Sequence, residues 1–318
     1  MCGVTRLSAE LDDGLVLGID GGGTRSRVRI ARADGSVVST EFGGGVNPNS
    51  GSDPYRSLTD VFSRALDKIT EGDRARIRAG VAGLAGFLSG PDAMTQATVD
   101  AWRSVGLPGT PTVCSDLVVG YWSALAQPGV EVPADGVILV AGTGAVAATI
   151  RGIAVDRIID GYGYILGDRG AGAWLGMAVA RAALDSATGR GPATVLEGLV
   201  LDGVSPHDWI GNFYKQPPNR VAALSMHLDT AQARDDEVAG QIVAQAIDEL
   251  VQSVHAAAEN DTANIVLTGS IAAGDNPIGN GLREKLRGQG FNLIKGLDGL
   301  EGAVELAKRK MTGQWPMN

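Results

Sequence analysis

Apolar and polar residues follow a strand-like order near the start of the chain. Residues 15–19 form an apolar run that ends in Asp20 and three glycines, and residues 26–32 alternate between polar and apolar. A polar turn at residues 33–36 then leads to a further apolar pair at 37–38. Alternation with a period of two is typical of a strand with one buried face. We therefore predict an antiparallel meander of three strands.

The same order returns at residues 137–159. An apolar run at 137–141 leads into Gly142-Thr143-Gly144, residues 145–150 alternate, and a turn precedes another strand-like stretch at 153–159. Repetition of one supersecondary unit predicts two similar domains. Two unrelated hairpins could also look this much alike.

Longer segments have the spacing of amphipathic helices. Residues 55–69 and 238–257 place apolar side chains three and four positions apart, and 302–310 predicts a final helix. Residues 264–267 predict a strand before Thr268-Gly269-Ser270. Mixed strands and helices in this order predict an α/β fold. We expect one domain at 14–117, joined by the last helix at 302–313, and a second at 118–301.

Composition excludes several classes of protein. The 318 residues are 44% hydrophobic and 20% charged, with a formal net charge of -9 and no Lys/Arg cluster, so we expect no nucleic-acid partner. The longest apolar run, 137–148, is broken by glycines and too short to span a bilayer, and residues 1–13 lack a hydrophobic signal core. We therefore expect a cytoplasmic protein without membrane contact. The cysteines, Cys2 and Cys114, form no disulfide framework or C-x-x-C pair.

The glycine turns are the first candidates for chemistry. The P-loop pattern is absent, and Gly142-x-Gly144-x-x-Ala147 precedes an alternating run instead of opening a helix, which argues against a dinucleotide fold. A glycine turn between strands can still offer backbone N–H groups to phosphate, with Thr24 and Thr143 adding hydroxyls. Asp20 at the head of the first turn would then hold Mg²⁺. Each turn alone is equally well explained as a tight hairpin.

Two carboxylates stand at further positions of interest. Asp116 follows a strand-like segment and precedes a helical one, where α/β sites gather, so it is the candidate general base. Asp168 lies in a glycine-rich stretch, 161–172, that leads into a helix and could contact a sugar. Ser115 or Asp116 could instead serve as the N-cap of the following helix, and Asp168 could likewise be an N-cap.

Four segments together resemble a known family. They are Ile19-Asp20-Gly21-Gly22-Gly23-Thr24-Arg25-Ser26, Gly142-Thr143-Gly144, residues 161–172 and Leu267-Thr268-Gly269-Ser270. In this order they resemble the N-acetylglucosamine kinase and BadF/BadG/BcrA/BcrD ATPase family across nearly the whole chain. The resemblance implies an actin-like (ribonuclease H-like) fold of two domains around an interdomain cleft, closing over ATP, Mg²⁺ and a sugar. It also implies phosphorylation of an amino sugar, with Asp116 as general base. The first candidate reaction is the conversion of N-acetylglucosamine to its 6-phosphate.

The resemblance assigns roles residue by residue. Asp20 would bind the metal, three turns would bind ATP, and a further set would contact the sugar. The ATP-binding residues are Gly21, Gly22, Gly23, Thr24, Gly142, Thr143, Gly144, Gly269 and Ser270. The sugar-binding residues are Asn47, Asp116, Gly161, Tyr162, Gly163 and Asp168.

The chain departs from the family pattern beside the sugar-binding residues. Ala145 and Val146 stand where a serine is usual, Arg169 replaces a glutamate, and Pro48-Asn49 replace a common aromatic. Glucosamine and N-acetylmuramic acid therefore remain possible acceptors, and Arg169 would suit a carboxylated sugar. A dehydratase-activating ATPase with an Fe–S cluster, or a non-catalytic sugar sensor, could carry the same motifs. We also expect a homodimer.

Overall fold

The computed structural model describes residues 14–216, 218–258 and 264–316. The first sheet contains β1 (Leu15–Gly21), β2 (Arg25–Arg32), β3 (Val37–Gly44), β4 (Ile77–Leu84) and β5 (Thr112–Ser115), in the order β3-β2-β1-β4-β5. β1 pairs with β2 and β2 with β3 in antiparallel fashion, so the meander predicted from the alternating pattern is confirmed. β4 and β5 extend the sheet in parallel with β1.

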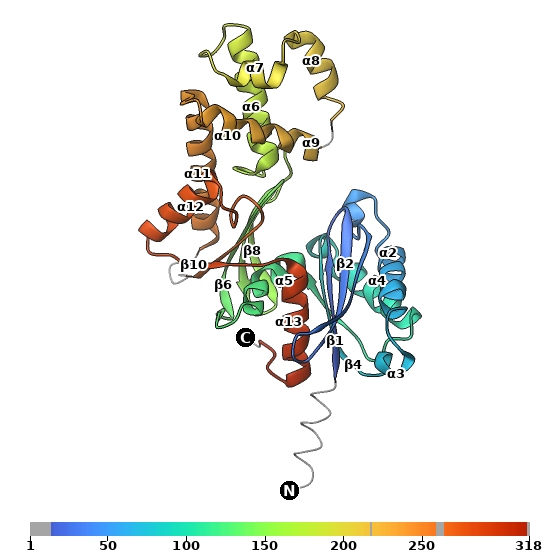
Figure 1. Cartoon of the computed structure of the whole chain (residues 1–318). Helices are drawn as coiled ribbons and strands as arrows, with labels where there is room; N and C mark the ends of the chain where they lie inside the picture. Colours follow the sequence, from blue (N-terminus) through green and yellow to red (C-terminus); the bar gives the residue numbers. More distant parts are fainter. Residues whose placement is uncertain (1–13, 217, 259–263, 317–318) are drawn as a thin grey trace. The chain divides into compact units, whose positions relative to one another are not determined.

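Helices cover both faces of this first sheet. Leu15, Leu17 and Ile19 of β1 share a core with α2 (Pro54–Leu66) and α4 (Pro91–Ser104). The other face packs against α5 (Asp116–Trp122) and α13 (Gly299–Thr312), which lie on the opposite side of the sheet from α2 in Figure 1. α2 ends three residues earlier than the periodicity predicts, and the amides of Lys68 and Ile69 donate to carbonyls three residues before them instead of four. Four short elements complete this part: α3 (Glu71–Arg74) and the 3-10 turns η1 (Pro48–Ser50), η2 (Phe87–Ser89) and η3 (Ser123–Ala126).

Glycines allow the helices to approach the first sheet closely. A Cβ at Gly18 would lie 2.6 Å from the side chain of Val304 in α13, and one at Gly83 would lie 2.1 Å from Val119 in α5. A Cβ at Gly302 would lie 1.8 Å from the carbonyl oxygen of Val119, so α13 and α5 cross almost backbone to backbone. Part of the high glycine content therefore serves packing.

The second sheet repeats the plan of the first. It contains β6 (Asp135–Ala141), β7 (Ala145–Arg151), β8 (Ala154–Asp160), β9 (Asn264–Thr268) and β10 (Asn292–Lys295), in the order β10-β9-β6-β7-β8. From the β8 edge this order is β8-β7-β6-β9-β10, which matches β3-β2-β1-β4-β5 in the first sheet. In both sheets a meander of three strands is extended, beside its first strand, by two parallel strands. The predicted duplication and the α/β, actin-like fold class are confirmed.

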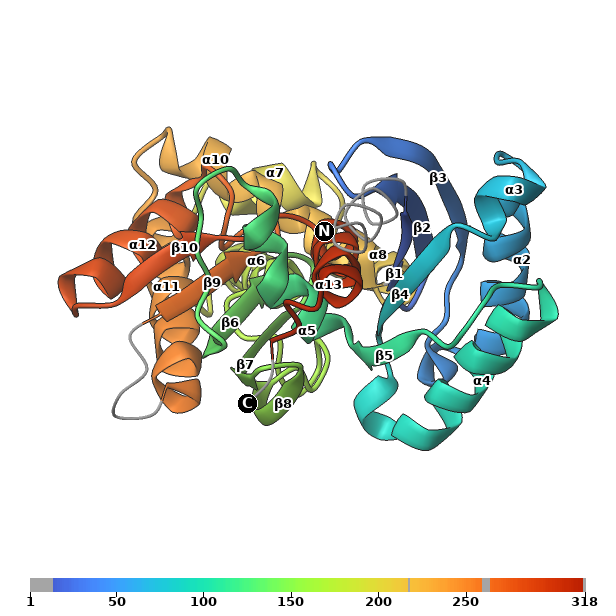
Figure 2. The same cartoon turned by 90° about the horizontal axis from the view of Figure 1, so that it is seen from below.

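The core of the second sheet is built on two long helices. α6 (Gly172–Ala187) and α11 (Glu237–Ala257) pack against β6 and β7, and α12 (Pro277–Gly288) packs beside β9 and β10 (Figure 2). Residues 196–232 form helices that the sequence did not predict. These are α7 (Leu196–Leu201), α8 (Pro206–Phe213), α9 (Pro218–Ala223), η4 (Leu224–Met226) and α10 (His227–Gln232).

The chain divides into two compact units. Unit 1 contains residues up to 135, 150–156 and 296 onward, and unit 2 contains 136–149 and 157–295. The domain bounds expected from the sequence, 14–117 and 118–301, stay a prediction. Within the described residues, the structure has no helix with the length and apolarity of a membrane span.

Candidate active site

Asp20 and Asp116 lie at one edge of the first sheet. β1, β4 and β5 are parallel, and their registers align Gly21 with Leu84 and Leu84 with Ser115. Asp20 therefore stands one residue before this row and Asp116 one residue after it. Because neighbouring strands are about 4.8 Å apart, two strand spacings separate the backbones by roughly 10 Å. The sheet thus brings both predicted carboxylates to its carboxyl edge.

Asp116 begins α5, and Ser115 caps that helix. The Ser115 hydroxyl accepts from the Leu117 amide at 3.2 Å and donates to Asp116 Oδ1 at 3.0 Å. Burial raises the pKa of the Asp116 carboxyl, and the negative charge of Asp20 adds to this rise, while the bond from Ser115 opposes it. Because Ser115 performs the capping, Asp116 is not the cap of α5.

Asp20 is held from two sides within unit 1. The Arg27 guanidinium donates to Asp20 Oδ2 and also to Asp298, which caps α13 by accepting from the Leu300 amide at 2.9 Å. Asp20 Oδ1 lies against Gly299, where a Cβ would come within 2.9 Å. Burial raises the pKa of the Asp20 carboxyl and Asp298 adds to the rise, whereas Arg27 opposes it.

The donor set around Asp20 fits a magnesium ion that reaches the protein together with phosphates. Mg²⁺ prefers oxygen ligands, and with nucleotides it commonly uses one or two carboxylates and keeps several waters. In the part of the chain that the structure describes, no group of three or more His, Cys, Asp or Glu side chains is placed to hold a metal. Asp20 would supply such a carboxylate without a complete protein cage.

The first glycine turn is shaped by close packing. The Gly22 amide donates to Arg25 O at 2.9 Å, and the Val46 amide donates to Gly22 O at 3.0 Å. A Cβ at Gly21 would lie 2.5 Å from Val46, and one at Gly45 would lie 2.2 Å from the carbonyl oxygen of Gly23. No glycine of the turn has a positive φ, so these positions need small size instead of left-handed backbone.

Asn47 belongs to the loop that packs on the first turn. Its Oδ1 accepts from the Asn49 amide at 3.0 Å and caps the 3-10 turn η1. The same oxygen lies near Gly86, where a Cβ would approach it to 2.5 Å. Unit 1 thus gathers the first turn, Asn47 and the two carboxylates on connections that leave the same sheet.

The second glycine turn is bound to the start of α6 in unit 2. The Gly142 amide donates to Gly144 O at 2.9 Å, which closes the turn between β6 and β7. The Gly172 and Ala173 amides of α6 donate to Gly142 O and Thr143 O at 2.8 and 2.9 Å. These two helix amides are occupied, so they are not free for an anion or a sugar hydroxyl.

The third turn adjoins the second. Gly269 has a φ of +85°, and a Cβ there would lie 2.3 Å from Ala141 O, so this position requires glycine. The Ile271 amide donates to the same Ala141 oxygen at 2.9 Å. A Cβ at Gly142 would lie 3.6 Å from Ser270 Oγ, which places the two turns in near contact.

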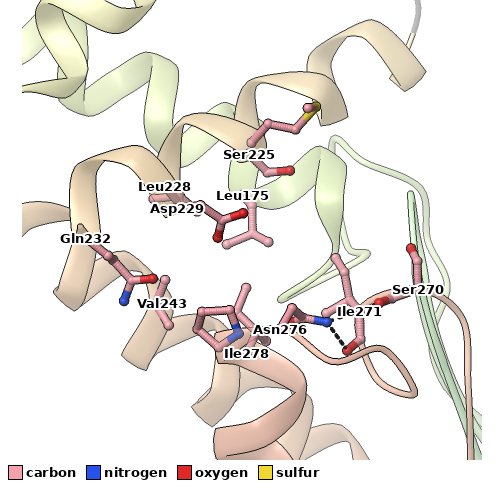
Figure 3. A pocket seen from close by; sticks show the side chains of 12 residues that line it. Leu175, Ser225, Leu228, Asp229, Gln232, Val243, Ser270, Ile271, Asn276 and Ile278 are labelled. Carbon is pink, nitrogen blue, oxygen red and sulfur yellow. Dashed lines mark hydrogen bonds between the residues drawn. The ribbon is translucent and has the colours of Figure 1, made fainter.

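A pocket of about 360 Å³ opens beside Ser270 within unit 2 (Figure 3). Its walls are mostly aliphatic, and they carry a few polar side chains. The lining residues are Leu175, Ser225, Met226, Leu228, Asp229, Gln232, Val243, Ser270, Ile271, Asn276, Pro277 and Ile278. Apolar walls with few polar groups suit a flat heteroaromatic ring.

Two amide side chains distinguish this pocket. Asn276 Nδ2 donates to the carbonyl oxygens of Ser270 and Ile271 at 3.1 and 3.0 Å, which holds the third turn against α12 (Figure 3). Gln232 Oε1 is buried and has no hydrogen-bond partner among the described residues. A buried carbonyl oxygen without a partner is costly, and a bound ligand with a hydrogen-bond donor would satisfy it.

The Gly161–Gly163 turn and Asp168 form the remaining part of unit 2's site. Asp168 has a φ of 53°, and its carboxylate accepts from the amides of Ala145 and Gly163. Burial raises the pKa of the Asp168 carboxyl, and Asp160 adds to the rise, whereas those amides oppose it. Tyr162 is 68% exposed, so its ring is accessible to a ligand.

Arg169 is paired within the protein. Its Nη1 lies 3.3 Å from Glu249 Oε2, and its side chain remains 57% exposed. Cys114 is buried beside Asp116, and burial raises the pKa of its thiol to about 12. Cys2, the other cysteine of the chain, lies outside the described residues.

Sequence reasoning missed four polar side chains that the site contains. Arg27 lies among the polar positions of β2, and Gln232 lies in a helix that was not predicted. Asp160 and Asp298 each directly precede a glycine. An aspartate beside a glycine is a visible signal for a turn or a helix start. Nothing local indicates that Arg27 reaches Asp298, which lies far along the chain.

The chain is similar to known proteins along most of its length. A model of the BadF/BadG/BcrA/BcrD ATPase family matches residues 17–307. The N-acetylmuramic acid/N-acetylglucosamine kinase of Clostridium acetobutylicum is 31% identical over 255 residues, covering 77% of this chain and 79% of the relative. The glucosamine kinase of Vibrio cholerae is 25% identical over 226 residues, covering 69% of this chain and 67% of the relative.

Solved structures share the fold. A protein from Chromobacterium violaceum, provisionally named an N-acetylglucosamine kinase, superimposes with a TM-score of 0.67 at 23% identity. The likeness covers 92% of this chain and 98% of that one.

Proposed function

Because the chain belongs to the BadF/BadG/BcrA/BcrD ATPase family, we propose that it transfers the γ-phosphate of ATP to a hydroxyl of an amino sugar. N-acetylglucosamine, phosphorylated at its 6-hydroxyl, is the first candidate acceptor. The broader class is that of an ATP-dependent carbohydrate kinase, to which the two sequence relatives belong. In this proposal Asp116 accepts the proton of the attacking hydroxyl.

The environment of Asp116 is the observation that carries this proposal. The Asp116 side chain lies where the parallel strands β4 and β5 end, at the same sheet edge as Asp20. Its pKa is raised by burial and by the negative charge of Asp20. A raised pKa makes the carboxylate a better proton acceptor near neutral pH. Its Oδ1 accepts from Ser115 and Leu117, so we assign the proton transfer to Oδ2.

We assign the nucleotide to groups that each unit contains. Gly21–Thr24 in unit 1 and Gly142–Gly144 in unit 2 are the phosphate-binding turns, through their threonine hydroxyls and backbone amides other than those of Gly22 and Gly142, which donate within the turns. Asp20 is the carboxylate for Mg²⁺, with Arg27 holding one of its oxygens. The metal would neutralise phosphate charge during transfer.

We assign the adenine ring to the pocket beside Ser270. The aliphatic walls would cover the faces of the ring, and the unpartnered Gln232 Oε1 would accept from its polar edge. Gly269 and Ser270 would then contact the ribose side of the nucleotide. The near contact of Gly142 with Ser270 supports this order, because phosphates and ribose are adjacent in ATP.

The sugar is assigned to Asn47, the Gly161–Gly163 turn and Asp168, besides Asp116. Arg169 suggested a carboxylated sugar, but its pairing with Glu249 already balances part of its charge. N-acetylglucosamine therefore ranks ahead of N-acetylmuramic acid as the acceptor.

An ADP-release assay with MgATP tests the proposal. N-acetylglucosamine, glucosamine, N-acetylmuramic acid and glucose would be compared at equal concentrations, and the product's phosphorylated carbon would be located by NMR. Stimulation by an amino sugar, greatest for N-acetylglucosamine, is expected. Turnover that no sugar stimulates would refute the kinase proposal and favour an ATPase or sensor.

A further inference from the structure

Asp160 is a buried carboxylate outside the groups assigned to ATP, metal and sugar. It ends β8, is 7% exposed and has a φ of 64°, a left-handed conformation that aspartate tolerates better than most residues. Its Oδ1 accepts from the Asp168 amide and its Oδ2 accepts from the Arg169 amide, both at 2.8 Å. Both oxygens of Asp160 are therefore used to hold the backbone at residues 168 and 169.

The neighbouring backbone is shaped to admit this carboxylate. A Cβ at Gly167 would lie 2.1 Å from Asp160 Oδ1, so only glycine leaves room for the contact. Asp168 itself has a left-handed φ of 53°. Two consecutive amides bound by one carboxylate counteract the strain of that conformation.

Asp168 extends the connection to both turns of unit 2. Its carboxylate accepts from the amide of Ala145, which directly follows the Gly142–Gly144 turn, and from the amide of Gly163. It also lies against Gly144, where a Cβ would come within 2.8 Å of Oδ2. The two turns are therefore tied to one side chain, whose backbone is held by Asp160.

We propose that Asp160 is a positioning residue that sets the geometry of both turns through Asp168, so that the affinities for ATP and for sugar depend on it jointly. This inference rests on the proposed function, which places phosphate at the Gly142–Gly144 turn and sugar at the Gly161–Gly163 turn. A residue that touched only the sugar would change the sugar KM alone. A residue that only stabilised the fold would change the melting temperature and leave both KM values unchanged.

The test compares Asp160→Asn and Asp160→Gly with the same changes at Asp202. Asn keeps the left-handed preference but turns an NH₂ group toward a backbone amide, and Gly removes both acceptors while leaving φ unrestricted. Asp202 is the matched control, because it also has a left-handed φ, of 47°, and is exposed at the end of α7. Gly167→Ala is a second variant, whose Cβ would displace the Asp160 carboxylate and would also lie 3.0 Å from the Cβ of Tyr162.

We expect Asp160→Asn to raise the KM for ATP and the KM for sugar together, each by about 10-fold, the size of one lost charged hydrogen bond. Asp160→Gly should raise both further, Gly167→Ala should reproduce the joint rise, and the Asp202 variants should change neither. Unchanged KM values with a lower melting temperature would overturn the inference. A rise in only one KM would overturn it as well.

A nucleotide titration separates this inference from the proposed function. A fluorescent ATP analogue with Mg²⁺ is titrated into each variant without sugar. Weaker binding by Asp160→Asn supports the positioning role even if the wild-type protein phosphorylates none of the sugars. Unchanged binding overturns that role, whatever the sugar assay shows.

Discussion

Replacing Asp116 by Asn should separate catalysis from stability. Asn keeps an Oδ1 that can accept from Ser115 and Leu117, but it cannot take a proton from the sugar hydroxyl. Loss of a general base lowers turnover by about 10²–10⁴-fold. That range corresponds to about 2.7–5.4 kcal/mol of activation free energy.

The same replacement should not weaken the fold. Because the pKa of Asp116 is raised, the folded state disfavours its charged form, so the ionised carboxylate destabilises the protein at neutral pH. Asp116→Asn removes this charge and leaves the Ser115 cap in place. We therefore expect a melting temperature equal to or above that of the wild type.

Ser115→Ala is the matched control with the opposite profile. Loss of the N-cap costs about 1 kcal/mol, or roughly 2–4 °C in melting temperature for a protein of this size. Turnover should fall by less than about 10-fold, since only one bond that orients Asp116 is lost. Turnover and melting temperature would be measured for both variants in one buffer. Equal losses of turnover in the two variants, or wild-type turnover in Asp116→Asn, would refute the general-base role.

Three further predictions concern pH, nucleotide choice and packing. Burial and the charge of Asp20 raise the pKa of Asp116 above the ordinary aspartate value of about 3.9. When the pH is lowered, kcat at saturating MgATP should therefore begin to fall while the pH is still above that value. A fall that begins only below that value would contradict this. Gln232→Leu should weaken the preference for ATP over GTP by about 10-fold in competitive assays, as expected for one lost hydrogen bond; an unchanged preference would exclude Gln232 from base recognition. Gly302→Ala should destabilise the protein by about 1–3 kcal/mol in urea unfolding, because its Cβ would meet a carbonyl of α5 at 1.8 Å. The control Gly198→Ala, with open space around it, should stabilise the protein by about 0.5–1 kcal/mol.

Much of the fold could be predicted because its signals are local. The alternating stretches at 26–32 and 145–150 identified β2 and β7, and the repeated order of strand, glycine turn and strand identified the duplication that the two sheet orders confirm. The helices of residues 196–232 could not be predicted in the same way. They are short, from a single turn to eight residues, so their apolar periodicity extends over too few positions to be distinguished from a loop.

The candidate site was predictable only in part. The glycine turns and Asp116 follow strand-like segments, which is a pattern visible in sequence. The partners of these groups are set by register and by contacts between distant residues. Arg27 reaches Asp298 only because β2 lies beside β1 and α13 crosses the same sheet.

The sequence by itself determined the α/β class, the duplicated meander and the positions of the glycine turns, because alternation and small residues act over a few neighbouring positions. Tertiary structure alone decided that Arg27 joins Asp20 to Asp298 and that Asp160 holds the backbone of Asp168. Burial and the alignment of parallel strands also decided that two carboxylates share one sheet edge with raised pKa values. Desolvation and charge interaction depend on distances in space, which a pattern along the chain does not contain.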